Sequence, residues 1–364
     1  MTTDAPGELP TFLAAWAVVT AVAVPVVVAG RLLGRREGFW PRWQVVPFRG
    51  TLLDWLILYC GYVLVMSLGI VGLSSAGWLA GLTGRPVPPV MVDAEGYGAS
   101  LGGVAGAASA ATFRRDSARA NQLRQMAAGF LALPVVLGGA AFLRHVVHDI
   151  RPGFDWRSVP ADVARGAVAG VAFTPVVHAV YWLSKTLNAA GGGVEQAHPL
   201  AETGVGHSAG EIAFFLVSVC LVVPWIEELL FRGVMLRWLA RRQAHAVLVF
   251  AVALAFAATR GVAWEPKLGP TAFVIGLLLL SFAAGWFGSK RPRFPVRTVR
   301  AVLASSALFA AAHSAVWPSP VPLFVLACGL GYLTVRTGRI TAAVVAHGLF
   351  NAVSSVILIR QSAS

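Results

Sequence analysis

Charged side chains are scarce in this sequence. They make up 12% of its 364 residues, whereas soluble globular proteins carry about 25%. Hydrophobic residues account for 57% and occur in long blocks, which is the pattern of membrane proteins. This composition excludes an ordinary soluble domain and predicts a chain that crosses a membrane several times.

Acidic side chains are the rarer of the two charge signs. The chain has 16 Asp and Glu against 29 Lys and Arg, which gives a formal net charge of +13. In a soluble protein this excess would suggest nucleic acid as a partner. Here the arginines lie in short clusters between apolar blocks, so we expect them to set membrane topology and contact anionic lipid. No nucleic-acid partner is expected.

Cysteine is also rare, and several catalytic motifs are missing. Cys60, Cys220 and Cys328 all lie inside apolar blocks, and no pair has the spacing of metal ligands. They are expected to be small buried hydrophobic residues without a disulfide framework. The sequence has no HExxH, no Gly-x-Ser-x-Gly and no Walker motif, so the zincin, hydrolase-elbow and P-loop templates do not apply.

Apolar runs of about 20 residues predict membrane-spanning helices, because that length crosses the hydrocarbon core. The fold class is therefore an all-α polytopic bundle of about eight to ten helices. The first run follows an acidic N-terminus without the basic region of a cleaved signal peptide, and we expect it to be retained. The runs are 12–31, 52–74, 127–143, 164–184, 210–226, 244–259, 270–288, 300–316, 320–335 and 340–359.

A loop is predicted at about 84–125, between the second and third runs. Its segment 96–112 consists mostly of small residues and fits either an extramembrane loop or a re-entrant segment. With ten helices and an external N-terminus, four arginine-rich connections fall on the cytoplasmic side, as the positive-inside rule requires. Four other arginines would lie outside unless the region holds a further membrane segment. The four connections are 31–50, 232–243, 289–300 and 336–339, and the four arginines are Arg114, Arg115, Arg119 and Arg124.

Two glutamates end an apolar stretch of the chain, in the sequence 224-PWIEELLFRG-233. A carboxylate at membrane depth is costly unless it has a partner. Glu228 and Arg232 are at i,i+4 and share a helix face, whereas Glu227 is rotated by about 100°. We expect Glu228 to neutralise Arg232 while Glu227 points into the bundle. A salt bridge at a helix end would explain the first two residues, but it explains Glu227 less well. Pro224 has no N–H and is expected to kink the helix, turning Glu227 toward a cavity.

Two more polar clusters lie in apolar helices of the C-terminal half. His313 ends 309-FAAAH-313, and His347 and Asn351 share a helix face in 347-HGLFN-351. Aligned hydrogen-bonding groups in mid-membrane indicate a bundle interior or a wet cavity. A packing histidine and an interhelical clamp of roughly 0.6–2 kcal/mol are the structural alternatives.

Together the three clusters supply what amide hydrolysis needs. A carboxylate or imidazole can take a proton from water, and an imidazole N–H with an Asn amide can donate two hydrogen bonds to the tetrahedral oxyanion. Glutamate and histidine also bind zinc well, so the same residues suit a divalent metal.

The three motifs EELLFR, FAAAH and HGLFN resemble, in order, the EExxxR, FxxxH and HxxxN motifs of the CPBP family (CAAX protease and bacteriocin processing, also called Abi). This family includes the type II CAAX prenyl endopeptidases. The resemblance covers roughly 208–358. It implies a glutamate-dependent intramembrane protease that needs no cofactor or metal, with a conical membrane cavity formed by the C-terminal helices.

The resemblance also implies a role for each motif residue. Glu227 corresponds to the general base, and His313 helps to orient and activate the water. His347 and Asn351 correspond to an oxyanion hole. Glu228 and Arg232 hold the motif in place, and Phe309 lines the site.

The chain departs from the family in one spacing. Glu227 and His313 are 86 positions apart, whereas a few tens of residues separate these motifs in the usual member. We therefore predict membrane helices in 1–205 and a protease domain in 206–360, with an inserted helical hairpin at about 244–290 that keeps the membrane sidedness. Glu227 meets His313 only if the glutamate helix continues past Gly233 toward Arg241, and we expect that continuation.

Two other function classes remain. A non-catalytic membrane protein could use the same residues to bind a partner or ligand, and a transporter could use them as a proton relay. The transporter ranks lower, because the N-terminal half has no counterpart to the motifs. The high Arg, Ala and Gly content suggests a bacterial inner membrane. Since bacteria generally do not prenylate proteins, the expected substrate is a membrane-anchored protein or a peptide leader.

Overall fold

The computed structural model confirms an all-α membrane protein. The residues that it describes form helices and turns, and no strand occurs among them. Six of their helices are long and apolar enough to cross a membrane, so the chain is a multi-pass membrane protein. The described residues are 51–74, 103–147, 156–190, 208–242, 245–253, 296–314 and 316–363, with positions 13, 17, 20, 21 and 24.

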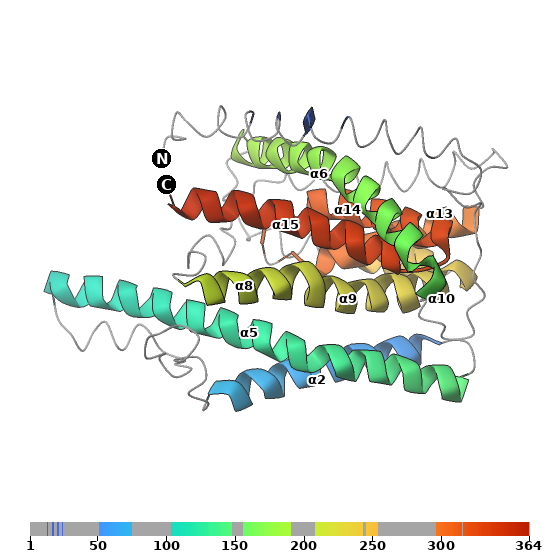
Figure 1. The fold of residues 1–364 in the computed structure, drawn as a ribbon, viewed down its shortest axis with the longest axis horizontal. Helices are drawn as coiled ribbons and strands as arrows, with labels where there is room; N and C mark the ends of the chain where they lie inside the picture. Colours follow the sequence, from blue (N-terminus) through green and yellow to red (C-terminus); the bar gives the residue numbers. More distant parts are fainter. Residues whose placement is uncertain are drawn as a thin grey trace. The chain divides into compact units, whose positions relative to one another are not determined.

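Each predicted apolar run that lies within the described residues overlaps a helix, although several of these helices extend beyond their runs. The helices are drawn in Figure 1. Residues 245–253, within the predicted run 244–259, are helical. The run 270–288 and most of 12–31 lie outside the described residues. The main helices are α2 (Leu52–Ser74), α5 (Gly103–Val147), α6 (Val159–Ala190), a helix over Ala209–Arg241, α13 (Val296–Ala312), α14 (Pro320–Thr337) and α15 (Thr341–Ala363).

The loop predicted at 84–125 is wrong for its second part, because α5 is helical from Gly103 onward. Residues 84–102 lie outside the described part of the chain. The segment is rich in alanine, which has the highest helix propensity, and the helix therefore extends beyond its apolar span, Arg119–Leu143. Two of the four arginines that the predicted topology places outside the membrane have polar contacts in α5. Arg119 pairs with Glu211, and Arg124 donates to Asn121 Oδ1 at 3.0 Å.

The glutamate helix continues from Ala209 to Arg241, which confirms the predicted continuation past Gly233. It consists of α8 (Ala209–Val217), the π-helix η2 (Ser218–Val222), α9 (Val223–Glu228), the π-helix η3 (Leu229–Met235) and α10 (Leu236–Arg241). Each π segment widens a turn of the helix, a feature frequent at functional sites. One of these segments ends directly before the Val-Pro pair that precedes the glutamates.

The chain forms two compact units. The first comprises Met1–Trp55, Ala141–Gln196 and Glu227–Phe350, and the second comprises Leu56–Ala140, Ala197–Ile226 and Asn351–Ser364. Each unit draws on both predicted domains, 1–205 and 206–360, and that division of the chain stays a prediction.

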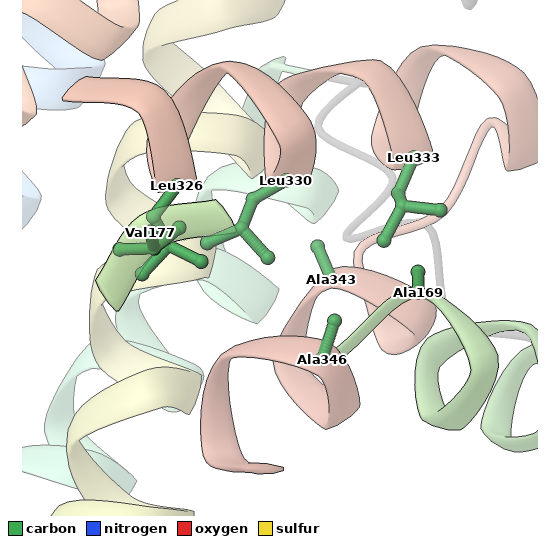
Figure 2. Close-up of a cluster of buried hydrophobic side chains, with 7 residues drawn as sticks. All are labelled: Ala169, Val177, Leu326, Leu330, Leu333, Ala343 and Ala346. Carbon is green, nitrogen blue, oxygen red and sulfur yellow. The ribbon is translucent and has the colours of Figure 1, made fainter. Parts of the chain in front are cut away.

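In the first unit, α6, α14 and α15 share one apolar core (Figure 2). Small residues let these helices approach closely: a Cβ added to Gly166 would lie 2.5 Å from the backbone oxygen of Ala342. The core side chains are Ala169, Val177, Leu326, Leu330, Leu333, Ala343 and Ala346.

A buried carboxylate fixes one end of this core. Asp162, near the start of α6, accepts hydrogen bonds from Arg165 at 2.8 Å and from Arg339 Nε at 2.5 Å. Arg339 lies in the turn between α14 and α15, where Gly338 takes a left-handed conformation with φ 69°. The start of α6 is thereby bound to the turn that positions α15 and its His347.

Candidate active site

The predicted pair of Glu228 and Arg232 is present and fully buried. Arg232 Nη1 donates to Glu228 Oε1 at 2.9 Å, and neither side chain is exposed. Arg232 Nη2 also donates to the carbonyl of Ala327 on α14 at 3.3 Å. The guanidinium lies 4.6 Å from the ring centre of Phe309, in a cation–π contact. The arginine thus binds the glutamate helix to α13 and α14.

Glu228 has a second partner, which the sequence did not predict. His347 Nδ1 lies 3.0 Å from Glu228 Oε1. Because a carboxylate only accepts hydrogen bonds, Nδ1 must carry the proton, and the other ring nitrogen, Nε2, is left to serve the site. The two residues are separated by 119 positions, so no helical spacing could have indicated the contact.

Glu227 lies between the two motif histidines. Its Oε1 is 3.6 Å from His313 Nε2, and its Oε2 is 3.7 Å from His347 Nε2. These distances slightly exceed that of a direct hydrogen bond, and both histidines present Nε2 to the same carboxylate. Glu227 is 21% exposed while Glu228 is fully buried, so the two adjacent carboxylates differ in environment as helix geometry predicts.

His313 forms the accessible side of this cluster. It lies in the turn that follows α13, and its Nδ1 is 2.8 Å from the carbonyl of Phe309. A carbonyl can only accept, so Nδ1 is the protonated nitrogen and Nε2 faces Glu227. The side chain is 35% exposed, against 4% for His347. Of the two imidazoles beside Glu227, that of His313 is therefore the more exposed.

Phe309 is fully buried behind the polar residues. Its ring centre lies 4.7 Å from that of His313 and 5.9 Å from that of His347. Phe231 meets it edge-on at 5.2 Å. Phe309 thus packs against both imidazoles and Arg232, and it restricts the orientations that they can adopt.

Asn351 follows His347 by one turn of α15, yet its described hydrogen bond goes elsewhere. Its Nδ2 donates to the carbonyl of Val219, in the π-helix η2, at 2.7 Å. The predicted oxyanion role of this amide stays a prediction. Within the part of the chain that the structure describes, no group of three His, Cys, Asp or Glu is arranged to hold a metal ion.

Comparison with known families agrees with the motifs. A family model described as Rce1-like, type II CAAX prenyl endopeptidase, matches residues 209–293 and 285–353. The C-terminal region is thus similar to this family over 209–353. The Rce1-like match covers every motif residue named above, from Glu227 to Asn351, and the resemblance found in the sequence is confirmed. Comparisons with curated proteins and with solved structures gave no match.

Proposed function

We propose that this protein is an intramembrane endopeptidase in which Glu227 activates the hydrolytic water. The observation that carries the proposal is the placement of one partly exposed carboxylate between two imidazole Nε2 atoms, at 3.6 and 3.7 Å. The Rce1-like match supports it, because members of that family are generally proteases.

The proposed reaction depends on which groups of the site can accept and donate a proton. A water between Glu227 and the imidazoles gives one proton to the carboxylate as its oxygen attacks the scissile carbonyl carbon. Glu227 then passes that proton to the amide nitrogen as the C–N bond breaks, which leaves a carboxylic acid and an amine. Whenever His347 carries a proton on Nε2 as well, that N–H can donate to the developing oxyanion.

The buried residues keep this arrangement in place. Glu228 fixes the ring orientation of His347 through Nδ1, and Arg232 holds Glu228. The substrate that fits a site of this kind is a membrane-associated protein or peptide, because the site residues lie on or beside membrane-spanning helices.

The test compares Glu227→Gln with the unchanged protein in membranes of an expressing bacterial host. Mass spectrometry would map new peptide termini, and a synthetic peptide spanning the site found would then be cleaved by purified protein. Removing a general base costs about 10²–10⁴-fold in rate, so the new termini should vanish. Gly138→Ala is the matched control, because a Cβ there meets open space.

Termini that persist undiminished in Glu227→Gln would refute the proposal. If neither form produces termini, but Glu227→Gln and the unchanged protein retain the same membrane peptide on purification, the protein is a non-catalytic binder instead.

A further inference from the structure

The connection between α13 and α14 carries His313 and is bonded to the end of α6. In this connection, Trp317 Nε1 donates a hydrogen bond to Asn188 Oδ1 at 2.9 Å, across 129 positions of sequence. Asn188 lies two residues before the end of α6. Both residues are buried, with 6% of Trp317 and 5% of Asn188 exposed. They belong to the first compact unit, as do Glu227, His313 and His347.

Asn188 is a buried residue at a helix end that is otherwise exposed. Residues 186, 187, 189 and 190 of α6 are all exposed. Burying an amide costs free energy unless the amide is hydrogen-bonded, and a buried indole N–H likewise usually has a partner. The contact with Trp317 therefore accounts for the burial of a polar side chain at this position.

Backbone hydrogen bonds join the neighbours of Trp317 to His313. Val316 directly precedes Trp317, and its N–H donates to the carbonyl of His313 at 3.2 Å. The N–H of Ser319 donates to the carbonyl of Val316 at 2.9 Å. Pro318 follows Trp317, and its ring fixes φ at that position. A displacement of Trp317 would therefore reach the backbone of His313 through a single turn.

His313 depends on this connection, because α13 ends at Ala312 and the histidine lies in the turn beyond it. Its side chain is 35% exposed, and its Nε2 lies 3.6 Å from Glu227 Oε1. His347, in contrast, lies within α15 and contacts Glu228 through Nδ1 at 3.0 Å. Of the two histidines beside Glu227, His313 is thus the one whose backbone is set by a connection between helices.

We propose that the hydrogen bond between Asn188 and Trp317 anchors the connection 313–319 to α6 and makes Asn188 a positioning residue for His313. Asn188 acts through Trp317 and the turn after His313, which together hold Nε2 of His313 beside Glu227. The activity readout of this inference rests on the proposed function, whereas its hydrogen-exchange readout does not.

Amide hydrogen exchange of the purified protein tests the anchor directly. Asn188→Leu keeps a side chain of similar size but removes the acceptor, so the N–H groups of His313 and Val316 should exchange about 10-fold faster. Those of α15 should not change. Thr186→Val is the matched control, because it removes only a hydrogen bond within the end of α6, from Thr186 Oγ1 to the carbonyl of Trp182 at 3.0 Å. Unchanged exchange of the connection in Asn188→Leu would overturn the inference, whether or not the protein is a protease.

A kinetic cycle tests whether the anchor acts through His313. Asn188→Leu should lower kcat about 10-fold with KM unchanged, because a catalytic group is misplaced. In a His313→Ala background the same change should cause no further loss of kcat. The double variant of Asn188→Leu with Trp317→Phe removes both polar groups, so its Tm should return close to that of the unchanged protein while its kcat stays low.

Each other result overturns the inference. A kcat that recovers together with Tm in the double variant would make the contact a structural bond only. An equal loss of kcat in the His313→Ala background would show that Asn188 acts by another route, and an unchanged kcat in Asn188→Leu would show that it positions nothing. Should Asn188→Leu fail to fold, the double variant still decides, because the inference requires its exchange at 313–319 to be fast and its kcat to be low.

Discussion

At the scale of single residues, Glu228 is a fully buried carboxylate that depends on its hydrogen-bond partners. One of its oxygens accepts from Arg232 at 2.9 Å and lies 3.0 Å from His347 Nδ1, and the side chain is fully buried. Buried charges are stable only with a partner and good hydrogen-bond geometry. Glu228 is therefore expected to matter for stability as well as for the orientation of His347.

The prediction is that Glu228→Gln lowers the free energy of unfolding by about 3–5 kcal/mol, because it leaves the Arg232 charge buried and uncompensated. Denaturant unfolding in detergent measures this. The matched control is Glu228→Gln combined with Arg232→Met, which removes both charges and should recover most of the loss. A single variant within about 1 kcal/mol of the unchanged protein would contradict the burial argument.

At the scale of helices, the approach of α6 to α15 depends on missing side chains. A Cβ at Gly166 would lie 2.5 Å from the backbone oxygen of Ala342 and 2.7 Å from Cβ of Val345, and one at Gly170 would lie 3.0 Å from Cα of Ala346. Backbone atoms cannot move aside as a flexible side chain can. Alanine at either position must push the two helices apart.

We expect Gly166→Ala to lower the free energy of unfolding by about 1–3 kcal/mol through overpacking. Gly138→Ala in α5 is the control, because its Cβ meets nothing within 4 Å and alanine favours a helix over glycine by up to about 1 kcal/mol. In the same detergent, the Tm of Gly166→Ala should fall, whereas the Tm of Gly138→Ala should rise or stay unchanged. Equal shifts would show that the helix contact is not tight.

At the scale of the whole molecule, arginine placement predicts the orientation in the membrane. The connections 31–50, 232–243, 289–300 and 336–339 should face the cytoplasm, and 185–209 should face outside. Four arginines, among them Arg119 and Arg124, disagree with this orientation. In the described part of α5, Arg119 pairs with Glu211 and Arg124 donates to Asn121, so these two arginines have partners within the protein. The positive-inside rule applies to arginines in short loops. Arginines that lie in a long helix and have partners in the protein need not follow it.

The orientation can be measured by cysteine labelling. After Cys60, Cys220 and Cys328 are replaced by alanine, one cysteine is placed in 289–295 and another, in a separate variant, in 191–200. A membrane-impermeant maleimide added to intact cells should label the second and leave the first unlabelled until the membrane is opened. The reverse pattern would contradict the ten-helix topology.

Local sequence patterns were enough to predict the class of this protein and the contact between Glu228 and Arg232. A long apolar run in lipid must be helical, because a helix satisfies the hydrogen bonds of its own backbone. The i,i+4 spacing of Glu228 and Arg232 places these two side chains in contact within one helix. Both are local properties. The loop prediction failed over 103–125, because low hydropathy there indicated a position outside the membrane but not the absence of a helix.

The way the polar residues share their hydrogen bonds became visible only in three dimensions. Glu228 reaches His347 across 119 positions, and Asn351 reaches Val219 across 132. The second contact also depends on a π turn, and the helical periodicity of a sequence does not specify where such a turn forms. These contacts result from how helices far apart in the chain pack against one another, and that packing depends on long-range side-chain fit.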